Sequence, residues 1–147
     1  MGEVRHEAVI NSPREKVFAY VDDYRNVPDY MFGVDRFTPT TDIDHGLGAE
    51  FSTAIKVGPK ELASTVRCTE WVDGELIKLA SVKGFGADTD WAFADGDEPG
   101  TTILSVRFGY TLPGGLAGKV LGGLIGPFAE QGVKHVESKI RDAIEAS

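Results

Sequence analysis

Polar and apolar residues alternate through most of the segment from Val34 to Leu112, and this period of two constrains the fold more than any other sequence feature. In the stretch 50–57, residues of one parity are apolar or β-branched, namely Phe51, Thr53, Ile55 and Val57. Successive side chains of a β-strand point to opposite faces of a sheet, whereas a helix repeats its apolar residues every three or four positions. The segment is therefore predicted to consist of strands.

Short turn sequences, rich in glycine, proline and aspartate, separate the alternating stretches. They lie at Gly58–Lys60, Val72–Glu75, Gly84–Gly86 and Asp95–Gly100. Strands that follow one another through such turns are antiparallel, because parallel neighbours need a long crossover. A further strand is predicted over Glu3–Asn11, with Val4, Ala8 and Ile10 on one face. An antiparallel sheet of about seven strands is therefore expected.

Two short helices are predicted after the first strand. Ser12 with Glu15 three residues later is a capping-box sequence, and Pro13 suits the first helical position. The buried face of this helix would consist of Val17, Phe18 and Val21. The helix should end before Pro28, because the residue that precedes a proline disfavours the α conformation. A second helical turn is expected over Asp29–Phe32.

The region from Leu112 to Ser147 is predicted to be one long helix. Its second half has an apolar stripe with helical spacing, formed by Val133, Val136, Ile140 and Ile144. A helix of about 30 residues would span about 45 Å, enough to lie across a whole sheet. We therefore expect a single α+β domain over residues 1–147, in which a curved antiparallel sheet wraps around the C-terminal helix and leaves an apolar cavity.

Glycine recurs every four residues at the start of this helix, at 114, 118, 122 and 126, and Pro127 follows. Each glycine costs up to about 1 kcal/mol relative to alanine, and the proline should kink or loosen the helix. One interpretation is a deformable lid over the cavity. Its apolar residues, facing ligand or core, would be Leu116, Val120, Leu121, Leu124, Ile125 and Phe128. The alternatives are close packing against the sheet and a transient membrane contact; a spanning helix is not expected.

The charge balance argues against a nucleic-acid partner. The chain has 15 lysine and arginine residues against 23 aspartate and glutamate residues, and its formal net charge is −8. The basic residues are scattered, whereas a nucleic-acid surface needs them clustered. Cys68 is the only cysteine, so no intrachain disulfide can form. Because the first ten residues lack the pattern of a secretory signal, a cytoplasmic location is expected.

No metal or cofactor is predicted. His6, His45 and His135 do not have the spacing of metal ligands. The acidic stretches lack the pattern of a calcium loop, and neither a phosphate loop nor a nucleophile elbow occurs.

Several short segments resemble those of a known superfamily. They are Ile10-Asn11-Ser12-Pro13 with Val17, Phe18 and Asp22, the Trp91-x-Phe93 strand, Gly100-Thr101-Thr102, and Leu112-Pro113-Gly114-Gly115. The chain resembles the START-related helix-grip (SRPBCC) superfamily, in particular its bacterial polyketide cyclase/dehydrase-like members. The resemblance implies a cavity for a hydrophobic or amphipathic small molecule, used for lipid transport, ligand sensing or polyketide ring closure. The fold hosts both binders and enzymes.

Aromatic residues of the predicted strands, and apolar residues of the last helix, are the candidate ligand contacts. They are Tyr30, Phe32, Trp91, Phe93, Phe108, Tyr110, Leu116, Val120, Leu124 and Phe128. For any single aromatic residue, ordinary core packing is the alternative. No catalytic residues can be assigned: Arg67, Asp90 and His135 are expected at the surface, and the Tyr110 hydroxyl is the best candidate for a polar contact in the cavity.

Two functions that use the cavity remain open, and a third possibility is a protein whose cavity is vestigial and whose surface engages another protein. The first is binding or carriage of a hydrophobic small molecule or lipid by a monomer or dimer. The second is a polyketide cyclase/dehydrase-like enzyme that acts on a ligand in the same cavity. Ionisable or hydroxyl groups converging inside the cavity would favour the enzyme.

Overall fold

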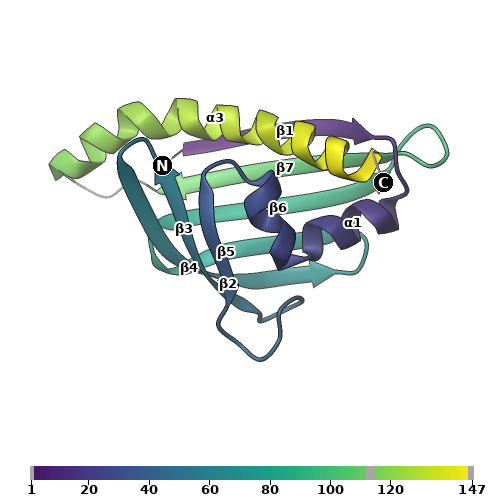
Figure 1. Cartoon of the computed structure of the whole chain (residues 1–147), viewed down its shortest axis with the longest axis horizontal. Helices are drawn as coiled ribbons and strands as arrows, with labels where there is room; N and C mark the ends of the chain where they lie inside the picture. The colour runs from purple at the N-terminus through teal and green to yellow at the C-terminus, as the bar shows by residue number, and fades with distance from the viewer. Residues whose placement is uncertain (1, 112–114, 146–147) are drawn as a thin grey trace.

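The computed structural model describes residues 2–111 and 115–145, with the side chains of residues 115–126, 128, 129 and 133 outside that description. A curled sheet forms one layer, and the long helix lies along one of its faces (Figure 1). The elements in chain order are β1 (Gly2–Ile10), α1 (Arg14–Asp22), a 3-10 turn (Tyr24–Asn26), α2 (Val27–Tyr30), β2 (Val34–Pro39), β3 (Glu50–Val57), β4 (Lys60–Val72), β5 (Leu76–Gly84), β6 (Gly86–Asp95), β7 (Thr102–Thr111) and α3 (Gly115–Glu145).

The seven strands form one antiparallel sheet in the order β1-β7-β6-β5-β4-β3-β2. Strands β2 to β7 are a continuous meander, as the turn sequences predict. Strand β1 lies at the edge beside β7, where Val4 is paired with Phe108 and Ile10 with Thr102. The first and last strands of the chain are therefore neighbours in the sheet.

Gly84, at the end of β5, shows why the chain breaks there. Its φ is 81°, in the left-handed region that side-chain-bearing residues avoid. A Cβ atom at this position would lie 2.4 Å from the carbonyl oxygen of Ala63. Only glycine fits both constraints, and the chain turns directly into β6.

The capping box predicted at Ser12 is wrong. Helix α1 begins at Arg14 with Pro13 as its N-cap and has no side-chain cap. The Ser12 amide donates to the carbonyl oxygen of Ile10, so it is not available to Glu15. Ser12 is buried, and its carbonyl oxygen accepts a hydrogen bond from the Thr102 hydroxyl at 2.7 Å. The serine thus joins β1 to β7 instead of capping the helix.

The second short helix, α2, begins two residues earlier than the predicted turn at Asp29 and ends at Tyr30. Pro28 lies in its first turn, where the missing amide hydrogen costs nothing. Helix α1 ends at Asp22, before the proline as expected, but Val27 next to Pro28 is in the α conformation (φ −55°, ψ −46°) and begins α2, so the predicted reason for the end of the helix is wrong.

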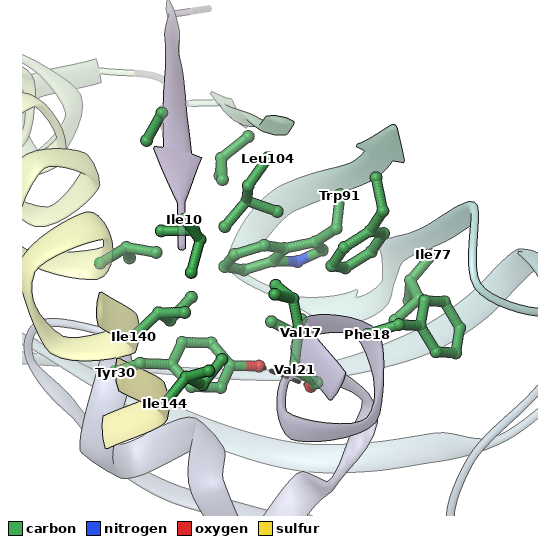
Figure 2. Packing of buried hydrophobic residues seen from close by; sticks show 14 of the residues in the cluster. Ile10, Val17, Phe18, Val21, Tyr30, Ile77, Trp91, Leu104, Ile140 and Ile144 are labelled. Atoms are coloured by element: carbon green, nitrogen blue, oxygen red, sulfur yellow. Dashed lines mark hydrogen bonds between the residues drawn. The ribbon is translucent and has the colours of Figure 1, made fainter. Parts of the chain in front are cut away.

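The C-terminal half of α3 supplies one wall of the hydrophobic core (Figure 2). Val136, Ile140 and Ile144 are buried, which confirms the predicted stripe except for Val133, whose side chain lies outside the described set. They join a cluster that includes Ile10 of β1 and Trp91 of β6. Burying each such side chain contributes roughly 1.5–3 kcal/mol. This apolar contact holds α3 across the sheet.

Helix α3 is continuous over 31 residues, and Pro127 lies inside it without ending it. The predicted long helix is therefore confirmed over Gly115–Glu145, and the remaining residues of the predicted region lie outside the described ones. Whether the glycine-rich half is a lid or a packing surface depends on side chains outside the described set. Within residues 2–111 and 115–145, no helix is long and apolar enough to cross a membrane.

Candidate functional site

A cavity of about 50 Å³ lies between α2 with β2 and the inner face of strands β3 to β7. Strand alternation places its lining residues, because every second side chain of each strand faces inward. The lining consists of Val27, Tyr30, Met31, Val34, Phe37, Thr53, Ile55, Ser64, Val66, Leu79, Ala87, Thr89, Trp91 and Phe108. The polar side-chain atoms of this wall belong to Tyr30, Trp91 and three hydroxyl-bearing residues, namely Thr53, Ser64 and Thr89. The other side chains are hydrocarbon, with the sulfur atom of Met31.

Ser64 is the unusual residue of this lining. It is 7% exposed, and its Oγ atom is buried without a hydrogen-bond partner among the described residues. It is paired in register with Thr53 of β3, which also lines the cavity. A buried hydroxyl without a partner costs about 1–3 kcal/mol. The cavity therefore contains a polar group that a ligand could satisfy.

Tyr30 is a fixed part of the cavity wall. Its hydroxyl donates to the carbonyl oxygen of Val21 at 2.9 Å, and its ring lies edge-on to Trp91 with 5.4 Å between ring centroids. Burial raises the pKa of Tyr30 far above its ordinary value. A phenol that is neutral and already bonded serves as a wall and an anchor for α1 and α2, not as a proton donor to a ligand.

A second hollow, of about 30 Å³, adjoins the cavity. Val27, Tyr30, Phe37 and Leu79 line both spaces. The rest of its wall consists of Val21, Asp22, Tyr24, His45, Gly46, Phe51, Cys68 and Ile77. Ionisable groups therefore lie next to the apolar cavity.

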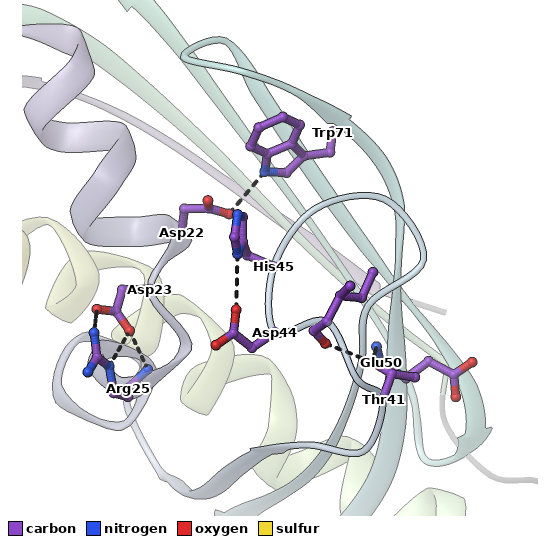
Figure 3. A network of polar contacts seen from close by, with 9 residues as sticks. Asp22, Asp23, Arg25, Thr41, Asp44, His45, Glu50 and Trp71 are labelled. Carbon is purple, nitrogen blue, oxygen red and sulfur yellow. Dashed lines mark hydrogen bonds and ion pairs between the residues drawn. The ribbon is translucent and has the colours of Figure 1, made fainter.

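Asp22 and His45 form the polar end of this hollow (Figure 3). Asp22 Oδ1 accepts a hydrogen bond from Trp71 Nε1 at 3.0 Å, and His45 Nδ1 lies 3.0 Å from Asp44 Oδ1. Burial raises the pKa of Asp22, against the lowering effects of the Trp71 hydrogen bond and of His45. The hydrogen bond with Asp44 raises the pKa of His45. Burial thus favours the neutral form of the Asp22 carboxyl group, and the hydrogen bond with Asp44 favours the protonated form of the His45 imidazole.

Sequence reasoning did not identify Asp22, His45 or Ser64 as site residues. His45 lies in the irregular loop between β2 and β3, where no sequence period indicates which side chains point inward. Strand alternation could have identified Ser64, because this residue lies two positions before the inward-facing Val66 on β4 and therefore on the same face. A hydroxyl at a position that alternation assigns to the core is a candidate ligand contact.

Cys68 lies in the wall of the second hollow. The thiol is free and buried, and burial raises its pKa. A thiol held in its neutral form is a poor nucleophile, so Cys68 contributes to packing.

The predicted ligand contacts fall into three groups. Tyr30, Trp91 and Phe108 line the cavity. Phe93, Tyr110 and Phe32 lie outside its lining. The side chains of Leu116, Val120, Leu124 and Phe128 lie outside the described residues. Contact of any of them with a ligand stays a prediction.

The three aromatic residues outside the lining have other neighbours. Phe93 lies edge-on to Phe18 in the main core, with 5.1 Å between ring centroids. Tyr110 belongs to the small cluster around Phe108, and no described residue hydrogen-bonds its hydroxyl. Phe32 lies against the ring of His135 of α3 at 5.3 Å. His135 is therefore half-buried, contrary to the expected solvated position.

The two other charged candidates face away from the cavity. Arg67 pairs with Glu50 at 2.6 Å, and Asp90 pairs with Arg107 at 2.7 Å. Their predicted position outside the cavity is confirmed. Among the residues that the structure describes, no group of three or more histidine, cysteine, aspartate or glutamate side chains could hold a metal ion.

Solved structures share this fold over almost the whole chain. TTHA0849 from Thermus thermophilus is 20% identical with a TM-score of 0.81, covering 99% of this chain and 98% of that one. The ZhuI aromatase/cyclase from Streptomyces sp. R1128 is 12% identical with a TM-score of 0.79, covering 98% and 93%. A START superfamily protein from Mycobacterium smegmatis is 14% identical with a TM-score of 0.71, covering 96% and 98%.

The comparison with curated proteins gave no match. A family match, in contrast, covers residues 1–141 of the 147 residues, so it includes both hollows and α3 up to Arg141. The helix-grip architecture predicted from the alternating strands and the C-terminal helix agrees with this match. The chain belongs to the family described as polyketide cyclase/dehydrase and lipid transport.

Proposed function

We propose that this protein binds and carries a hydrophobic small molecule or lipid in the cavity between the sheet and its helices. The observation that carries the proposal is the composition of the cavity wall. The wall is mostly hydrocarbon with a few hydroxyl groups, and one of these, Ser64 Oγ, is buried without a partner among the described residues. Ligand sites commonly combine an apolar lining with a few polar groups that fix orientation. Family membership supports the same function.

The size of the cavity sets a condition on binding. A volume of about 50 Å³ gives room for roughly three to five water-sized groups. A larger ligand must therefore displace part of the wall. Met31 and Phe37 are half-buried, and methionine adapts readily because its side chain is flexible. We expect these two side chains to move when a ligand enters.

A matched pair of substitutions on β6 tests the proposal. Ala87 points into the cavity, whereas Ala92 is exposed on the opposite face of the same strand. Ala87→Leu should fill the cavity and weaken binding of fatty acids and flat aromatic compounds at least tenfold in calorimetric titrations. Ala92→Leu should bind as the wild type does. Equal binding by all three proteins would place the ligand elsewhere and contradict the proposal.

The second hollow supports an alternative function, a cyclase/dehydrase-like enzyme. Asp22 and His45 both line it, and both have raised pKa values, Asp22 through burial and His45 through its hydrogen bond with Asp44. Groups of this kind can act as general acid and base on a carbonyl compound. The enzyme would lose turnover in Asp22→Asn and His45→Gln while it still bound the substrate. Turnover of poly-β-carbonyl compounds by the wild type, abolished in both variants, would favour this function over carriage.

A further inference from the structure

The two hollows and an outer cleft share parts of their walls. Four residues are common to the walls of the apolar cavity and the second hollow: Val27, Tyr30, Phe37 and Leu79. Asp22, Tyr24 and His45 in turn line both the second hollow and an outer cleft of about 260 Å³. A ligand whose apolar part occupied the cavity would thus extend toward Asp22.

Asp22 retains one acceptor oxygen for a ligand. Its Oδ1 atom accepts from Trp71, and no described residue donates to Oδ2. The neighbouring Asp23 differs, because Arg25 gives its carboxylate three hydrogen bonds of 2.8–3.0 Å. Asp23 is therefore satisfied, whereas Asp22 can accept another donor.

The charges around Asp22 favour a positively charged donor. Asp23 and Asp73 add negative charge, and Asp22 is the last residue of α1, whose final turn contains no basic residue. A helix C-terminus is itself the negative end of the helix dipole. Arg25 is held by Asp23, whereas His45, which lies beside Asp44, also acts on Asp22 and lowers its pKa when protonated.

Aromatic rings form much of the remaining wall. Phe37 is stacked on Phe51 at 4.6 Å, and Tyr24 lies 6.3 Å from Phe51. Aromatic faces attract cations, and this attraction strengthens when the cation leaves water. The hollow of about 30 Å³ has room for about two water-sized groups, which is the scale of a primary ammonium group.

We propose that the second hollow is a subsite for a primary ammonium group held by Asp22, so that the ligand is an amphipathic amine. Its apolar part lies in the adjoining cavity, and in this respect the inference rests on the proposed function. The ammonium donates hydrogen bonds to Asp22 Oδ2, and the aromatic walls of the hollow surround its remaining surface.

The two tryptophan residues of the chain allow the subsite and the cavity to be tested separately. Trp71 binds Asp22, whereas Trp91 lines the apolar cavity. In ¹⁵N-labelled protein each indole N–H gives its own NMR signal, which Trp71→Phe assigns. Octylamine, octanol and octanoate serve as probes with the same chain. Octylamine should shift both signals and bind at least tenfold more tightly than octanol, which should shift mainly Trp91.

The possible results separate the two proposals. If octanol and octylamine bind equally and leave the Trp71 signal in place, the ammonium subsite is overturned while the cavity function stands. Tighter binding of octanoate would also overturn it. If none of the probes shifts Trp91, the cavity function fails, and the inference built on it fails too.

A charge-matched pair of variants completes the test. Asp22→Asn keeps an acceptor for Trp71 but removes the negative charge, so it should abolish the tenfold preference for octylamine and leave octanol binding unchanged. Asp97 lies in the exposed turn between β6 and β7, and the control variant Asp97→Asn changes the net charge by the same amount. It should keep the preference. An unchanged preference in Asp22→Asn, with the Trp91 signal intact, overturns the proposal.

Discussion

Ser64 is a hydroxyl at a position where the alternation of β4 places a core side chain. The neighbouring inward residue, Val66, has the apolar side chain expected there. The serine thus costs stability in the unliganded protein, since its Oγ atom is buried without a partner among the described residues. Asp22 is a similar case, because burial opposes its ionised form. Residues that reduce stability in this way are common at functional sites.

Replacing Ser64 with alanine should have opposite effects on stability and on binding. Ser64→Ala removes an unpaired buried hydroxyl, so the free energy of unfolding of the unliganded protein should rise by about 1 kcal/mol. Ligand affinity should fall, because the cavity loses its polar anchor. Chemical denaturation and calorimetric titration measure the two effects, and Ser52→Ala on the same sheet is the control. A less stable Ser64→Ala protein would mean that the hydroxyl already has a partner.

Asp22 should make stability depend on pH in the acidic range. Its folded-state pKa is raised above the ordinary value of 3.8, so the folded protein binds this proton more tightly than the unfolded chain does. Protonation of Asp22 therefore stabilises the folded protein fully below pH 3.8, and this stabilisation is lost as the pH rises through the folded-state pKa. The stability of Asp22→Asn relative to the wild type should therefore rise with pH across this window. Melting temperatures of both proteins at several pH values measure this difference. If the relative stability of Asp22→Asn fell with pH instead, the folded-state pKa of Asp22 would be lowered.

At the scale of elements, α3 is held against β1 by apolar and polar contacts together. Glu137 pairs with His6, and Arg141 donates to the carbonyl oxygen of Val9 at 2.9 Å. The hydrogen bond from His6, with support from Arg141, lowers the pKa of Glu137. These polar contacts lie beside the buried stripe of α3 and fix the helix in register with the edge strand.

Ile140 should dominate the apolar part of this attachment, because its side chain is 0% exposed in the main cluster. Ile140→Ala should lower the free energy of unfolding by about 2–5 kcal/mol, through lost burial and the space it leaves. Denaturant titration measures the loss. The exposed neighbour Lys139 supplies a control, since Lys139→Ala should change stability by less than about 0.5 kcal/mol. Similar losses in both variants would contradict the assigned role of the stripe.

The regular elements could be predicted from the sequence, and the site could be predicted only in part. Alternation in β3 and the stripe of α3 are local patterns, and burial enforces them. The capping-box pattern at Ser12 failed because a tertiary hydrogen bond from Thr102 fixes that residue. His45 could not be placed, since its loop has no period. Strand alternation predicts that Trp91 and Phe108 lie on the inner face of the sheet. It does not predict which of the aromatic rings on that face border a cavity.

At the scale of the whole molecule, the described side chains of the curled sheet and of its short helices leave hollows between them. The apolar cavity adjoins the second hollow, which in turn shares part of its wall with the outer cleft. Polarity increases along the same direction, from hydrocarbon around Trp91 to the ionisable groups at Asp22. This gradient matches an amphipathic ligand with its apolar part inside.

Native mass spectrometry of the protein purified from its own host, followed by denaturing extraction, tests whether the cavity holds a ligand. The wild type should retain a small hydrophobic compound, and Ala87→Leu, with its cavity filled, should be isolated without it. Ala92→Leu should retain the compound. Retention of the same compound by Ala87→Leu would contradict binding in the cavity. Binding would also be contradicted if the wild type held no compound and its melting temperature did not rise with fatty acids, flat aromatic compounds or octylamine.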